Sequence, residues 1–155
     1  MLFSSLRVLV GLVVASGFVM AVAVSAQGPP VDASASFVDA SCGFPVQVEI
    51  TGKSGFIALP RDRAMVTFPA NWVTLTNLAD PERTFRTSIS GSFHLTFLED
   101  GVILLNATGR NLHIGFGPGM LLSIGSFSQA LDPLGNEVEP LGGNGQLIDV
   151  CSLIN

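Results

Sequence analysis

His94 and His113 are the only two histidines of this 155-residue chain, and they are its first candidates for chemistry. Each alternates with the apolar residues of its own segment, so each is expected on the opposite face of a strand. If those faces line a lumen, the imidazoles could meet Arg86, Arg110 or Asn111 in a polar cluster suited to proton transfer or ligand binding. If they meet solvent, all five are ordinary surface residues. Thr and Ser share the same faces, which favours the solvent-exposed interpretation.

No stretch of the chain carries a recognisable catalytic or metal-binding motif. Gly52-Lys53-Ser54 resembles the end of a phosphate-binding loop, but position 47 is glutamine where that motif needs glycine. The Gly-x-Ser-x-Gly signature of many serine hydrolases is missing. Two histidines without a nearby carboxylate pattern make a poor metal site. We therefore predict no catalytic residue, no metal and no cofactor, and lean towards a protein that is not an enzyme.

The two cysteines, Cys42 and Cys151, lie 109 residues apart, near the two ends of the segment with strand-like patterning. In an exported chain, two cysteines are more often joined in a disulfide than left as free thiols. We predict this bond, which would tie the end of the fold to its beginning.

The first 26 residues have the layout of a secretory signal peptide. Arg7 is followed by an uncharged apolar stretch from Val8 to Val24, and Val24-Ser25-Ala26 supplies small residues for cleavage before Gln27. An uncleaved membrane anchor is the alternative, because the apolar stretch is nearly long enough to span a bilayer. With cleavage, the protein is secreted, extracellular and not stably inserted in a membrane.

Loss of Arg7 with the signal peptide leaves six basic residues against twelve acidic ones, a net charge of −6. An acidic protein with scattered arginines is unsuited to nucleic acid or to anionic lipid surfaces. The partners that remain are uncharged ones, such as a small apolar ligand, or an extracellular protein.

Residues 27–41 are predicted to form a flexible leader, since they are rich in Ala, Ser and Asp and show no periodicity. Residues 42–155 show the two-residue alternation of β-strands, and Asp100-Gly101 is a strong hairpin signal. Gly125, inside a strand-like segment, predicts a bulge or sharp bend. We expect a single all-β domain of about eight to ten short antiparallel strands.

Tight turns between neighbouring segments favour an antiparallel meander closed as a small β-barrel of about eight strands. In such a barrel the first and last strands pair, which would bring Cys42 and Cys151 together. The alternative is an immunoglobulin-like β-sandwich with Trp72 in its core. An eight-stranded barrel is wide enough either to be filled by side chains or to hold one small ligand. The many Phe and Leu residues suit both a packed core and an apolar pocket.

Several motifs between Ser41 and Leu153 resemble a group of small exported proteins of actinomycete bacteria. The motifs are Cys42-Gly43-Phe44, Thr74-Leu75-Thr76-Asn77, Gly91-Ser92-Phe93-His94, Thr108-Gly109-Arg110-Asn111, Ile124-Gly125-Ser126-Phe127-Ser128 and Gly145-Gln146-Leu147-Ile148-Asp149-Val150-Cys151. The resemblance implies secretion and a compact β domain. That group has no assigned activity, so it supplies no catalytic residues.

Three functional hypotheses follow. The first is a secreted, non-catalytic barrel that binds a small apolar or amphipathic ligand or an extracellular partner. The second is a barrel isomerase or cyclase in which Arg86, His94 and His113 steer an apolar substrate inside the lumen. The third is a structural protein of the cell envelope.

Overall fold

The computed structural model describes residues 28–115 and 119–155, and the predicted signal peptide lies outside this range. The described residues form nine antiparallel strands and one short 3-10 helix, Cys151–Leu153, so the predicted all-β class is confirmed. The strands are β1 (Val31–Asp39), β2 (Val46–Leu59), β3 (Arg63–Thr67), β4 (Trp72–Asn77), β5 (Thr84–Ser88), β6 (Gly91–Phe97), β7 (Ile103–Ile114), β8 (Met120–Leu131) and β9 (Glu137–Asp149).

The segment predicted as a flexible leader contains a strand, and that prediction is wrong. Residues 31–39 form β1, whose nine residues all pair with residues 46–54 of β2. Alternate side chains of β1 from Ala33 onward are partly buried, with Phe37 packed against the core. The segment lacks a strong periodic signal of its own, so its strand depends on the backbone partners that β2 supplies.

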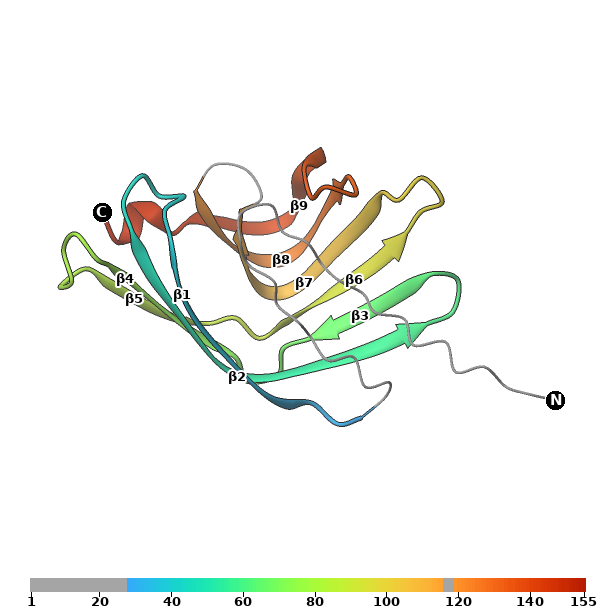
Figure 1. Cartoon of the computed structure of the whole chain (residues 1–155), viewed down its shortest axis with the longest axis horizontal. Helices are drawn as coiled ribbons and strands as arrows, with labels where there is room; N and C mark the ends of the chain where they lie inside the picture. Colours follow the sequence, from blue (N-terminus) through green and yellow to red (C-terminus); the bar gives the residue numbers. More distant parts are fainter. Residues whose placement is uncertain (1–27, 116–118) are drawn as a thin grey trace.

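Two groups of strands share the long strand β2 (Figure 1). The first half of β2 pairs with β1 and β4, and β4 pairs with β5; we call these strands the first lobe. The second half of β2 pairs with β3, and the sheet continues through β6, β7 and β8 to β9; we call these strands the second lobe. The sheet therefore divides next to β2, where β3 ends and β4 begins.

The sheet is open, and the predicted closed barrel is not the architecture observed. The strand path ends at β5 on one side and β9 on the other, and no pairing among the described residues joins the first strand to the last. In the view of Figure 1, β2 lies along the bottom and β9 along the top of the curved sheet. A turn at residues 68–71 separates β3 from β4, so the sheet divides into two lobes that pack together and does not curl into one cylinder.

A hydrophobic core joins the two lobes. It consists of buried side chains of β2, β4 and β8, of the connection between β5 and β6, and of the C-terminal segment: Val46, Val48, Val73, Leu75, Ile89, Met120, Leu122, Val150 and Ile154. Trp72, the residue expected in the core of the sandwich alternative, lies on the outer face of the first lobe and is 43% exposed. The layered packing thus resembles a sandwich, but without the core tryptophan that the alternative required.

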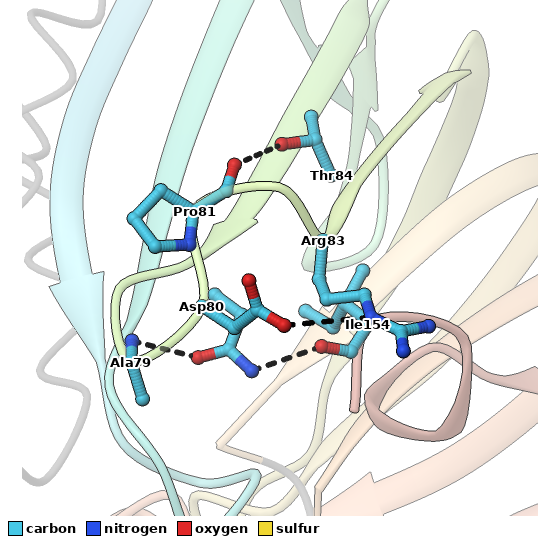
Figure 2. Close-up of polar contacts among 7 residues, drawn as sticks. Ala79, Asp80, Pro81, Arg83, Thr84 and Ile154 are labelled. Atoms are coloured by element: carbon cyan, nitrogen blue, oxygen red, sulfur yellow. Dashed lines mark hydrogen bonds and ion pairs between the residues drawn. The ribbon is translucent and has the colours of Figure 1, made fainter.

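The predicted disulfide between Cys42 and Cys151 is present, with a distance of 5.2 Å between the Cα atoms. It connects the turn between β1 and β2 to the first residue of the 3-10 helix that follows β9. A covalent bond thus joins the two ends of the fold where strand pairing was expected. A second tie lies at the turn between β4 and β5 (Figure 2), where the Asn77 amide donates a hydrogen bond to the Ile154 carbonyl over 3.0 Å. The oxygen of the Asn77 side-chain amide accepts a hydrogen bond from the backbone N–H of Ala79. Both ties hold the C-terminal segment against the first lobe.

A row of glycines crosses the second lobe and bends it. The register pairs Gly91 with Gly109, Gly109 with Gly125, and Gly125 with Gly145. Gly125 has a φ of 137°, and a Cβ there would lie 2.3 Å from the Asn144 carbonyl oxygen, so only glycine fits. The bend predicted at Gly125 therefore extends over four neighbouring strands.

The bend is sharp, as two ring positions demonstrate. Phe93 pairs with Ala107, and His113 lies six residues further along β7, which is about 20 Å on a straight strand. The Phe93 and His113 rings nevertheless meet edge to face with their centroids 6.0 Å apart. The part of β7 that follows Gly109 must therefore fold back over the face of the sheet that carries Phe93. That face becomes concave.

Candidate functional site

The concave side of the bend carries a set of buried side chains that alternate along β7 and its partner β8. We call this set the inner face. It consists of Leu105, Ala107, Asn111 and His113 of β7 together with Ser123, Phe127 and Gln129 of β8, all of them buried. The register pairs Leu105 with Gln129, Ala107 with Phe127 and Asn111 with Ser123, so each pair projects from one side of the sheet.

The inner face combines apolar and polar parts. Phe93 of β6 extends its apolar surface, and Phe68 packs edge to face on Phe93 with centroids 5.7 Å apart. Asn111, His113 and Ser123 lie on one side of the glycine row, and Gln129, which pairs with Leu105, lies on the other. The inner face is therefore apolar with buried polar groups at both of its ends.

His113 is 2% exposed and is held by one hydrogen bond, between its Nε2 and the Ser123 hydroxyl at 2.8 Å. The Ser123 hydroxyl also donates to the Asn111 carbonyl over 3.4 Å. Burial removes water from the imidazole and lowers the pKa of His113 to about 4. At neutral pH the side chain is therefore uncharged.

Four buried side-chain atoms of the described residues have no hydrogen-bond partner, and all belong to the inner face. They are Oδ1 of Asn111, Nδ1 of His113 and both polar atoms of the Gln129 amide. Buried polar groups in proteins are nearly always paired, and an unpaired one costs about 1–3 kcal/mol. The unpaired atoms lie on both sides of the glycine row, at Asn111 and His113 and at Gln129.

The structure does not bring the five sequence-predicted residues into one cluster. Only Asn111 and His113 lie on the inner face. Arg110 projects from the other side of β7, and its guanidinium donates to the Ser88 carbonyl at 3.1 Å and to the Thr87 hydroxyl at 2.7 Å.

The other two candidates are exposed. Arg86 lies on the outer face of the first lobe with its guanidinium carbon 4.7 Å from the centre of the Trp72 ring. His94 is exposed on β6, on the side opposite Phe93, where it pairs with Met65 and the exposed Asn106. Neither can take part in a site on the inner face.

Sequence reasoning missed Ser123 and Gln129. Ser123 follows two leucines, and the pairing that places it beside Asn111 could have been derived only from the β7–β8 register. Gln129 lies in an alternating segment where the serines at 126 and 128 are exposed, so nothing in its type or spacing marks it as buried. The burial of both residues depends on how the strands pair and bend in three dimensions.

Within residues 28–115 and 119–155, no three His, Cys, Asp or Glu side chains gather in an arrangement that could bind a metal ion. The same part of the chain contains no helix with the length and apolar character needed to cross a bilayer. Comparisons with protein-family models, with curated proteins and with solved structures find no match to this chain. The resemblance to exported actinomycete proteins stays a prediction.

Proposed function

We propose that this protein is a secreted, non-catalytic binding protein whose inner face holds a small apolar or amphipathic ligand. The observation that carries the proposal is the set of unpaired buried polar atoms on Asn111, His113 and Gln129. They lie among apolar side chains on the concave side of the bend. A bound molecule would supply the missing hydrogen bonds.

Two further observations support export and binding without catalysis. The disulfide between Cys42 and Cys151 is the kind of bond that persists in an oxidising, extracellular environment. The isomerase or cyclase hypothesis needed Arg86, His94 and His113 around one substrate, whereas Arg86 and His94 lie on exposed surfaces. No specific observation favours that hypothesis or the envelope-structural one, and we do not extend the proposal to them.

The direct test is to express the full chain in an exporting bacterial host, purify the protein from the medium and identify what an organic solvent extracts from it by mass spectrometry. We expect an apolar molecule in near-stoichiometric amount and an N-terminus at Gln27. Delipidated protein should then rebind an uncharged, fluorescent apolar probe such as Nile red. Protein that carries no extractable molecule and rebinds no probe would contradict the proposal.

A pair of variants locates the site. Ala107→Phe adds a ring to the inner face, where Ala107 is fully buried, and should reduce probe binding at least tenfold. Asn106→Phe adds the same ring at the next residue, which is exposed on the opposite side of β7, and should leave binding unchanged. Circular dichroism and thermal melting show that each variant folds. Equal binding by two folded variants would place the ligand elsewhere.

A further inference from the structure

We propose that the outer face of the first lobe binds a neutral oligosaccharide in an open cleft on β1, β2, β4 and β5. This site is separate from the inner face, which belongs to the second lobe, so the two proposals can fail independently. The inference follows from the polar groups that line the cleft, from their unused hydrogen-bonding capacity and from the tryptophan beside them.

The outward side chains of the first lobe form rows across its strands. They alternate with core-facing residues such as Val48 and Val73. The register aligns them in two neighbouring rows: Ser36, Glu49, Thr74 and Arg86 form one, and Ser34, Thr51, Trp72 and Ser88 form the other. Apart from the indole, both rows consist of hydroxyl and charged groups.

An open cleft of about 440 Å³ lies on these rows. Six outward-facing polar residues line it, namely Ser34, Ser36, Glu49, Thr51, Thr74 and Arg86, and two core-facing residues complete its lining. Glu49, Thr51 and Arg86 are exposed. The volume falls within the roughly 300–1,000 Å³ that is typical of small-molecule sites. The cleft therefore provides accessible space for a short saccharide.

Most of the lining groups have unused hydrogen-bonding capacity. Within residues 28–115 and 119–155, the side chains of Ser34, Glu49, Thr51, Thr74 and Arg86 form no hydrogen bond or ion pair with another residue. A carboxylate accepts, a guanidinium donates, and a hydroxyl does both. The backbones of Glu49 and Arg86 are two strand spacings apart, which is about 10 Å. A ligand between them must therefore donate and accept at several points, as a polyhydroxylated molecule does.

Trp72 adds an apolar surface beside the cleft. It is the only tryptophan of the chain, and it is 43% exposed. The guanidinium carbon of Arg86 lies 4.7 Å from the centre of its ring, so stacking holds the guanidinium in place while its N–H groups stay available. A sugar ring carries C–H groups on its faces and hydroxyls on its rim, and polarised C–H groups pack well against the electron-rich face of an indole. Aromatic, hydroxyl and charged groups together fit a saccharide.

The charges of this face favour a neutral ligand. The outward side chains of its four strands include two acidic and two basic groups, Asp32, Glu49, Lys53 and Arg86, so the face has no net charge. A polyanion would be repelled by the carboxylates and a polycation by the basic groups. A protein partner would need an apolar interface centre, whereas the exposed apolar residues Trp72 and Val38 are separated by the polar row.

A glycan array probed with the full-length secreted protein tests the ligand class. The array carries neutral oligosaccharides of glucose, mannose, galactose, xylose and N-acetylglucosamine, together with sialylated and sulfated glycans. We expect binding to at least one neutral series and none to the charged glycans. Binding to no neutral series, or to charged glycans alone, would overturn the proposal.

Intrinsic fluorescence locates the site, because Trp72 is the only indole of the chain. Titration with the soluble hexasaccharide of the bound series should change the Trp72 emission along a saturable curve. Isothermal titration calorimetry should give the same dissociation constant. Binding that leaves the Trp72 emission unchanged would place the saccharide elsewhere and would overturn the site.

Variants connect the binding to the cleft. Arg86→Ala and Glu49→Ala each remove a charged group that would hydrogen-bond the saccharide, and each should weaken binding about tenfold. The matched controls are Arg83→Ala and Glu82→Ala, which replace exposed residues of the turn between β4 and β5 and should leave binding unchanged. Circular dichroism and thermal melting show that each variant folds. Equal binding by all four folded variants would show that the cleft does not hold the saccharide.

Discussion

The buried imidazole of His113 should make the stability of this protein fall between pH 6.5 and pH 4. An imidazole in an unfolded chain has a pKa near 6.5, whereas burial lowers the pKa of His113 in the folded protein to about 4. Between these two pKa values the imidazole is protonated in the unfolded state and neutral in the folded state. The contribution of His113 to the free energy of unfolding is therefore fully present above pH 6.5, and it is lost as the pH falls towards the pKa of the folded state.

The magnitude follows from the difference in pKa of about 2.5, at 1.36 kcal/mol for each unit. We expect a loss of about 3 kcal/mol in the free energy of unfolding from this group alone. The groups that face His113 from the strands beside it are Phe93 of β6 and Leu121 and Ser123 of β8. None of these is titratable in this range, so no neighbouring charge offsets the loss.

Urea denaturation at pH 7, 5.5 and 4, followed by circular dichroism, measures the effect. Carboxylates also begin to titrate near pH 4, so the informative quantity is the difference between the wild type and His113→Phe, in which their contribution cancels. The variant should lose about 3 kcal/mol less than the wild type between pH 7 and pH 4. His94→Phe is the matched control, because it makes the same replacement at an exposed position.

Parallel pH profiles for the wild type and a folded His113→Phe variant would refute the reasoning. An NMR titration of the His113 ring with a midpoint near 6.5 would do so more directly. Either result would mean that water reaches the ring in solution, so that burial does not shield the imidazole as it does in the structure.

Two further predictions concern the scaffold. Replacing Cys42 and Cys151 together by alanine opens a loop of 109 residues, and the chain-entropy treatment predicts a loss of about 4.7 kcal/mol in the free energy of unfolding. The melting temperature should therefore decrease strongly. An unchanged melting temperature would mean that the disulfide does not stabilise the fold. Gly125→Ala puts a Cβ 2.3 Å from the Asn144 carbonyl oxygen at a φ of 137°, and should destabilise the protein by about 2 kcal/mol or more. Its control is Gly142→Ala, where the nearest atom is 3.9 Å away; equal melting temperatures for the two variants would show that the bend needs no glycine.

Local patterns were enough to predict much of the scaffold. Alternation of apolar and polar residues, as in Val46 and Val48 of β2, determines which face of a strand is buried. The hairpin at Asp100-Gly101 needs a positive φ, and Gly101 has a φ of 83°. The disulfide followed from the number of cysteines and the expected compartment. All of these depend on neighbours in the sequence or on composition.

Closure of the sheet could not be predicted in the same way. The alternation of a strand is the same in a barrel and in an open sheet with two packed lobes, since both bury one face. The decision depends on where the sheet divides, at the turn that separates β3 from β4. The strand at residues 31–39 is a similar case, because its ladder exists only when β2 lies beside it.

The candidate site shows the same division. By its types and spacing, the sequence identified Asn111 and His113 as polar residues that share one side of a strand. It could not determine that this side would be buried while the corresponding side at His94 meets solvent. Gly91, Gly109, Gly125 and Gly145 are scattered along the chain and form one line only when four strands are in register. That line folds β7 back over Phe93, and the desolvation of His113 follows from the fold.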